Sequence, residues 1–81
     1  MRIQIRVFAV LRELLPASQF ELEVPAGASC DAVCARLTRE FAAAKSILEH
    51  CMLAVNGQYA ARELRLSEGD ELALLPPVSG G

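Results

Sequence analysis

The 81-residue sequence has no long apolar run, no excess of basic charge and no even set of cysteines. A membrane-spanning helix needs about 20 apolar residues in a row, and the alternating start MRIQIRVFAV is unlike a signal peptide. With a net charge of −2, the chain has no basic footprint for nucleic acid. Three cysteines fit the cytosol better than a secreted disulfide framework. We therefore expect a cytoplasmic protein that binds neither a membrane nor nucleic acid.

The usual groupings of catalytic and metal-binding residues are also missing. The five glycines form no phosphate-binding loop, and the carboxylates are spread over expected strands and turns. Cys30 and Cys34 are four residues apart, a spacing that favours core packing on one helix face over a metal site. His50 and Cys51 are adjacent, so in a strand they point to opposite faces and make a poor base and nucleophile pair. No metal site is expected, and we expect a solvated histidine beside a half-buried cysteine.

Alternation of apolar and polar residues predicts several strands. In residues 2–9 and in residues 19–24, apolar residues alternate with polar ones. The apolar side chains therefore lie on one face, as expected for half-buried strands. Residues 52–60 predict a hairpin, because Asn56-Gly57 suits a turn in which both central residues have positive φ. Residues 71–75 predict a last strand after a turn at Ser67–Asp70.

Helical spacing predicts one main helix. Over residues 30–44 the apolar side chains recur every three or four positions, with Ser29 as the expected N-cap and Asp31 in the first turn. Residues 10–16 predict a short helical turn closed by Pro16. Residues 45–50 fit either an extension of the main helix or a separate turn.

This order of elements predicts an α+β protein of the ubiquitin-like β-grasp type. One main helix packs on one face of a mixed sheet of four to five strands, and 81 residues suffice for one domain with a modest core. We expect a β-grasp domain over residues 1–75 and an extended, flexible tail over residues 76–81 that ends in Gly-Gly.

Three apolar residues do not fit the predicted core. Phe8 is in phase with Arg6 on the polar face of the first strand, and Leu75 is in phase with Glu71. Tyr59 follows the hairpin turn and can join the same surface. Scattered exposed apolar residues are ordinary, but if Phe8, Tyr59 and Leu75 meet they predict a partner-binding patch.

The tail PPVSGG predicts an arm. Prolines have no N–H, so Pro76 and Pro77 cannot continue a strand ladder. From Pro76 to Gly81 an extended chain spans about 20 Å. Glycines have no side chain, so this arm can thread a channel too narrow for a Cβ, whereas the usual fate of a chain end is fraying. The residues expected to thread are Pro76, Pro77, Val78, Ser79 and Gly80, and they lead to the carboxylate of Gly81.

The sequence resembles the MoaD family, the small sulfur-carrying subunits of molybdopterin synthase. The resemblance covers nearly the whole chain and rests on FAVLRE at residues 8–13, LAVNG at residues 53–57 and LSEGDELALLPPVSGG at residues 66–81. The helical region matches in pattern only.

The resemblance implies a function for the tail. Gly81 would be the carrier residue: an ATP-using enzyme of the ubiquitin-activating type adenylates its carboxylate, and sulfur from a persulfide donor replaces AMP to give a thiocarboxylate. The large synthase subunit would receive this end and transfer the sulfur to a cyclic pyranopterin phosphate. Phe8, Tyr59 and Leu75 match positions where the family docks on its partners. The chain itself would be non-catalytic, with no permanently bound cofactor.

Three alternatives remain at this stage. The sulfur carrier of thiamin thiazole synthesis shares the fold, the Gly-Gly end and the activation step, but is typically shorter and lacks the PPVSGG ending. A ubiquitin-like modifier would instead form an isopeptide with a lysine. A plain β-grasp interaction domain would never have its end activated.

Overall fold

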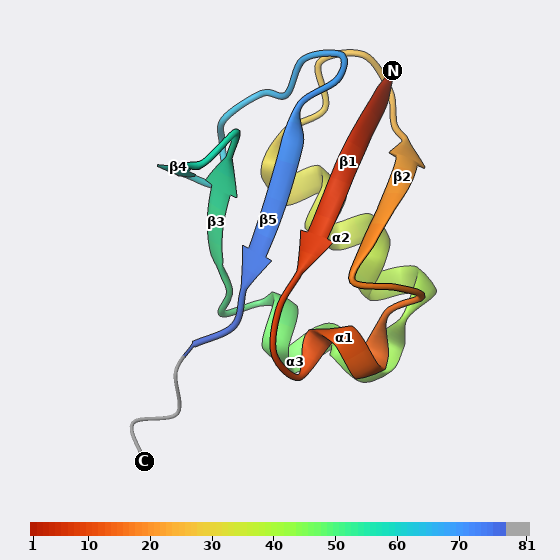
Figure 1. Ribbon diagram of the computed structural model, residues 1–81. Helices are drawn as coiled ribbons and strands as arrows, with labels where there is room; N and C mark the ends of the chain where they lie inside the picture. The colour runs from red at the N-terminus through yellow and green to blue at the C-terminus, as the bar shows by residue number, and fades with distance from the viewer. Residues whose placement is uncertain (78–81) are drawn as a thin grey trace.

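The computed structural model describes residues 1–77, which form a five-stranded mixed sheet with helices on one face (Figure 1). The strand order is β2-β1-β5-β3-β4; β1 and β5 are parallel, and the other neighbouring pairs are antiparallel. The mixed sheet with its main helix on one face is the fold that the sequence predicts. The elements are β1 (Arg2–Val7), α1 (Leu11–Leu14), β2 (Gln19–Glu23), α2 (Cys30–Glu40), the 3-10 helix η1 (Ala42–Ala44), α3 (Lys45–Leu48), β3 (Met52–Val55), β4 (Gln58–Ala60) and β5 (Glu71–Leu75).

The core lies between the sheet and α2. Alternate residues of the two central strands point toward the helix, and Ile3, Ile5, Leu72 and Leu74 have no solvent exposure. Complete burial of such a side chain contributes about 1.5–3 kcal/mol. The alternation therefore fixes which face of the sheet receives the helix and which remains open.

The main helix is shorter than predicted. Its N-terminus is as expected, because Ser29 Oγ accepts a hydrogen bond from the Ala32 N–H at 3.1 Å. The predicted helix 30–44 instead ends at Glu40, where Phe41 takes φ −130° and ψ 72° and packs its half-buried side chain against the core. The chain restarts as η1 and α3, so residues 45–50 form a separate turn and not an extension of α2.

Residues with positive φ shape two places where strands end. Asn56 and Gly57 have φ of 51° and 85°, which confirms the predicted turn of the β3–β4 hairpin. Ala9 has φ 54°, a left-handed value that is costly for a residue with a Cβ. The predicted strand 2–9 therefore stops at Val7, and the chain turns into α1.

The apolar stripe of α2 faces the sheet. Cys30, Val33, Cys34 and Leu37 are all buried, as their spacing predicts. Within residues 1–77 we find no helix that is both long and apolar enough to span a membrane.

Candidate functional site

The open face of the sheet carries an apolar surface built by strand register. Ala73 of β5 pairs with Ala54 of β3, which in turn pairs with Tyr59 of β4. Leu75 pairs with Met52 in the next row. Since Val7 pairs with Leu74, continuing the β1–β5 register places Phe8 beside Leu75. We name this surface the outer patch; its residues are Phe8, Met52, Ala54, Tyr59, Ala73 and Leu75.

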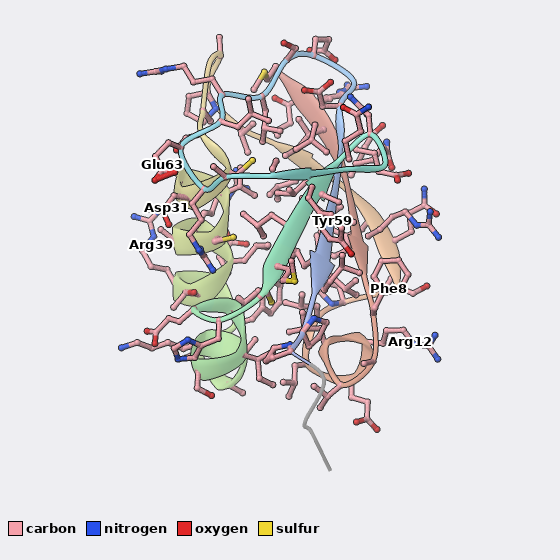
Figure 2. The ribbon with its side chains drawn as sticks, turned by 90° about the vertical axis from the view of Figure 1, so that its left-hand side faces the viewer. Phe8, Arg12, Asp31, Arg39, Tyr59 and Glu63 are labelled. Atoms are coloured by element: carbon pink, nitrogen blue, oxygen red, sulfur yellow. The ribbon has the colours of Figure 1, made fainter. Side chains whose placement is uncertain are left out.

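The outer patch is turned away from the helices, and all of its side chains except the buried Ala54 are at least partly open to solvent. Tyr59 is 74% exposed and Met52 is 55% exposed, both high values for large apolar side chains. Figure 2 shows Phe8 and Tyr59 on one side of the sheet and Asp31 and Arg39 of α2 on the other. The small side chains of Ala54 and Ala73 lie side by side in the row that ends at Tyr59. Such a surface suits a partner that inserts apolar side chains.

The structure places the three predicted docking residues on one face of the sheet. Phe8 and Leu75 are half-buried, and neither belongs to the core cluster. The outward direction that the sequence predicts for the Phe8 and Leu75 side chains is therefore correct. Their role in binding stays a prediction.

Met52 is a member of the outer patch that sequence reasoning missed. The segment Met52–Val55 is apolar throughout, so alternation does not reveal which side chains face outward. Only the pairing of Met52 with Leu75 shows its direction.

The described chain leaves the sheet directly from the outer patch. Leu75 ends β5, and it is followed by a half-buried Pro76 and an exposed Pro77. The other predicted tail residues, Val78, Ser79, Gly80 and Gly81, lie outside the described residues. The boundary between a domain at 1–75 and a tail at 76–81 therefore stays a prediction.

The cysteines have the environment of packing residues. All three are free and buried, and burial is the main cause that raises the pKa of each thiol. The pKa of Cys51 rises to about 11, and its Sγ donates a hydrogen bond to the Ile47 carbonyl at 3.2 Å. A thiol that stays protonated is a poor nucleophile. Cys51 is 8% exposed, so the half-buried cysteine expected there is in fact buried, while His50 is exposed.

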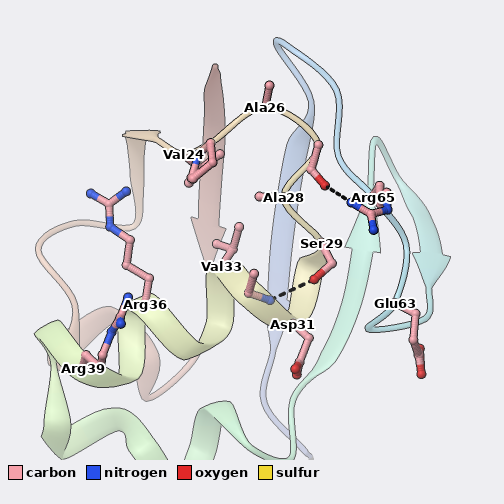
Figure 3. Close-up of a pocket in the computed structure, with 13 residues that line it drawn as sticks. Val24, Ala26, Ala28, Ser29, Asp31, Val33, Arg36, Arg39, Glu63 and Arg65 are labelled. Carbon is pink, nitrogen blue, oxygen red and sulfur yellow. Dashed lines mark hydrogen bonds between the residues drawn. The ribbon is translucent and has the colours of Figure 1, made fainter.

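A hollow of about 650 Å³ lies on the opposite side of the molecule, beside the N-terminus of α2 (Figure 3). Three of its polar side chains are engaged in structural contacts. Ser29 Oγ caps the helix, Arg65 donates to the Gly27 carbonyl at 3.0 Å, and Arg36 pairs with Glu40 at 2.9 Å. The lining contains no histidine or cysteine, and its one hydroxyl, that of Ser29, caps the helix.

No metal centre is evident in the part of the chain that the structure describes. Among residues 1–77, no three side chains of His, Cys, Asp or Glu come close enough to hold an ion. The candidate functional features of this region are the outer patch and the exit of the chain beside it.

Comparison with protein families gives one match over nearly the whole chain. The model of the ThiS family matches residues 5–81. Among curated proteins, the molybdopterin synthase sulfur carrier subunit of Chlamydomonas reinhardtii is 31% identical and is covered in full, as is this chain. The sequence-based resemblance to sulfur carriers is confirmed.

Solved structures share the fold over the whole length. Subunits 1 and 2 of the molybdopterin-converting factor from Helicobacter pylori form a complex that contains a chain 27% identical to this one; the alignment has a TM-score of 0.71 and covers 100% of both chains. Small archaeal modifier protein 1 of Haloferax volcanii is 27% identical with a TM-score of 0.82, over 95% of this chain and 98% of its own. These neighbours confirm the predicted β-grasp fold.

Proposed function

The chain belongs to the ThiS family, and from this membership we infer that it is a sulfur carrier protein of molybdopterin biosynthesis. We propose that it acts as the small subunit of a molybdopterin synthase, with the large subunit as its partner. The observation that carries this proposal is the match with the algal sulfur carrier subunit over the whole of both chains.

In this proposal the reacting group is the α-carboxylate of Gly81. A free α-carboxylate has a pKa of about 3.5 and is ionised at neutral pH. It is therefore a poor electrophile. Adenylation by a ubiquitin-activating-type enzyme with ATP supplies AMP as a leaving group. The outer sulfur of a persulfide donor displaces AMP to form an acyl disulfide, and a second thiol then cleaves the S–S bond, which releases the thiocarboxylate and leaves the donor sulfur and that thiol joined as a disulfide.

The remaining residues have supporting roles. The outer patch binds the large subunit, and Pro76 and Pro77 direct the chain away from the sheet beside it. Val78, Ser79 and Gly80 lead the thiocarboxylate into the partner, where sulfur passes to the pterin precursor. The acid and base groups belong to the partner, which agrees with the protonated, buried thiols of this chain. The chain is therefore a group carrier and not a catalyst on its own.

Intact mass spectrometry tests the proposal. The protein is incubated with a purified activating enzyme, ATP and a persulfide donor, and a control omits ATP. We expect a gain of about 16 Da, the exchange of one oxygen for sulfur, in the complete mixture only. An unchanged mass with an enzyme that activates a known carrier would contradict the carrier function.

The archaeal modifier among the structural neighbours favours one second candidate, a ubiquitin-like protein modifier. Both functions begin with adenylation and differ in the acceptor. The C-terminal carboxyl group of a modifier forms an isopeptide bond with a lysine of another protein. The product is a covalent conjugate of higher mass that resists thiol reagents. Conjugate formation without synthase activity would favour the modifier, whereas product formed with the large subunit would favour the carrier.

A further inference from the structure

We propose that Arg6 is a positioning residue of the outer patch, because its guanidinium holds the Phe8 ring in the orientation that a partner binds. Arg6 does not need to touch the partner for this role. The inference rests on the proposed function, in which the outer patch binds the large synthase subunit.

Phe8 lies just beyond the end of β1 and outside the core cluster. It follows Val7, the last residue of β1, and precedes Ala9 with its left-handed φ of 54°. Its side chain is half-buried and is not among those that pack against the core. Neither the strand ladder nor the core therefore fixes the ring.

Arg6 supplies the missing contact. Its Cζ lies 5.3 Å from the centroid of the Phe8 ring, within the range of a cation–π interaction. On its other side, Nη1 lies 3.6 Å from Glu71 Oε1. Glu71 belongs to β5, so the guanidinium is oriented from the neighbouring strand while it covers the ring.

Docking makes this contact stronger. The Arg6 side chain is 46% exposed in the free protein, and water there screens its interaction with the ring. A partner seated on the outer patch removes that water. Cation–π contacts gain strength when desolvated, so loss of the guanidinium is expected to weaken binding about fivefold to thirtyfold.

Arg2 offers a matched control on the same strand. It points to the same face as Arg6 and pairs with Glu23 at 3.2 Å, but it lies at the opposite end of β1 from Phe8. Its removal changes the net charge and the surface of β1 in the same way, without touching the ring.

The experiment is calorimetric titration of the purified large subunit with five proteins: the parent, Arg6→Leu, Arg2→Leu, Phe8→Ala and the double variant Arg6→Leu/Phe8→Ala. We expect Arg6→Leu to weaken binding about fivefold to thirtyfold, and Arg2→Leu to change it by less than about twofold. In the Phe8→Ala background the Arg6 effect should vanish, because Arg6 acts through the ring.

Two further readouts separate positioning from a general structural role. The aromatic proton signals of Phe8 should move in the free Arg6→Leu protein, and its melting temperature should stay near that of the parent. If Arg6→Leu unfolds, Arg6→Gln, which keeps a polar side chain on the strand, replaces it throughout.

The outcomes that overturn the inference are distinct from failure of the proposed function. An Arg6 effect that persists in the Phe8→Ala background shows direct contact with the partner and overturns positioning. Equal affinities for Arg6→Leu and Arg2→Leu do the same. If the parent itself does not bind the large subunit, the proposed function and the inference fall together.

Discussion

Single residues on β5 show how closely the core and the outer patch adjoin. Leu74 has no solvent exposure and packs in the core, while the next residue, Leu75, is half-buried on the open face. A substitution at Leu74 acts on folding. One at Leu75 is expected to act on docking with some cost in stability, so the most exposed member of the patch, Tyr59, separates the two effects best.

We predict that Tyr59→Ala weakens binding to the large subunit at least about tenfold, because aromatic anchors carry much of the energy of an interface. Its free energy of unfolding should change by no more than about 0.5 kcal/mol, since the side chain is 74% exposed. Calorimetric titration and urea denaturation measure the two quantities. Gln58→Ala is the control, as the adjacent residue of β4 faces the other way. Equal binding by both variants would exclude Tyr59 from the interface.

The buried thiol of Cys51 predicts a loss of stability in alkali. The folded-state pKa of about 11 exceeds the unfolded value of about 8.5. Its contribution to stability is therefore complete below about pH 8.5 and is lost as the pH rises toward about 11. Urea denaturation under reducing conditions measures the free energy of unfolding at pH 7.5 and at pH 10. This free energy should fall between the two pH values, and the fall should be smaller in Cys51→Ala than in the parent by about 1–2 kcal/mol. Parallel pH profiles for the parent and the variant would show that Cys51 is not protected from ionisation.

At the scale of elements, the β3–β4 hairpin depends on its turn. Gly57 has φ 85°, and a Cβ placed there would meet no atom within 4 Å. Gly57→Ala should therefore cost about 1–2 kcal/mol of folding stability through backbone conformation alone. Gly57→Asn should cost less, because asparagine adopts left-handed φ more readily. Urea denaturation compares the two variants, and equal losses would mean that the backbone preference does not set the cost.

The strands and turns could be predicted from the sequence because local chemistry specifies them. The alternation of apolar and polar residues predicted β1, β2 and β5, and the Asn56-Gly57 pair predicted the β3–β4 hairpin. The end of α2 could not be predicted, because the three alanines of η1 favour a helix. The half-buried Phe41 instead breaks the helix where its side chain packs on the core, and that packing is a tertiary effect.

The outer patch was predictable only in part. Phe8 and Leu75 stood out because they share phase with charged residues of their own strands. Met52 did not stand out in the sequence, because its strand is apolar throughout. Arg6 did not stand out either, because a charged residue on the polar face of a strand is ordinary. Met52 became apparent from its pairing with Leu75 of a strand distant in sequence, and Arg6 from its contacts with the Phe8 ring and with Glu71 of β5.

At the scale of the whole molecule, the outer patch and the chain exit meet at β5. β5 is the third strand in the sheet order, between β1 and β3, and it contributes Ala73 and Leu75 to the outer patch. Pro76 and Pro77 follow at once and end the ladder. A partner bound to the outer patch therefore has the start of the tail at a fixed place, and the distance to the carboxylate depends only on the residues that follow. The length of the tail and the size of its terminal side chains can therefore be tested separately.

We predict that three variants fold like the parent and lose most sulfur transfer: deletion of Gly81, Gly81→Ala, and addition of one residue after Gly81. Deletion shortens the arm by about 3.5 Å, and a misplacement of about 1 Å can cost about a hundredfold in rate. Gly81→Ala keeps the length but adds a Cβ. Intact mass reports activation, and single-turnover product formation with the large subunit reports delivery. Gln58→Ala, which leaves the tail unchanged and faces away from the outer patch, is the control and should retain activity. If the lengthened variant is activated and delivers sulfur as fast as the parent, the carboxylate of Gly81 is not the reacting group.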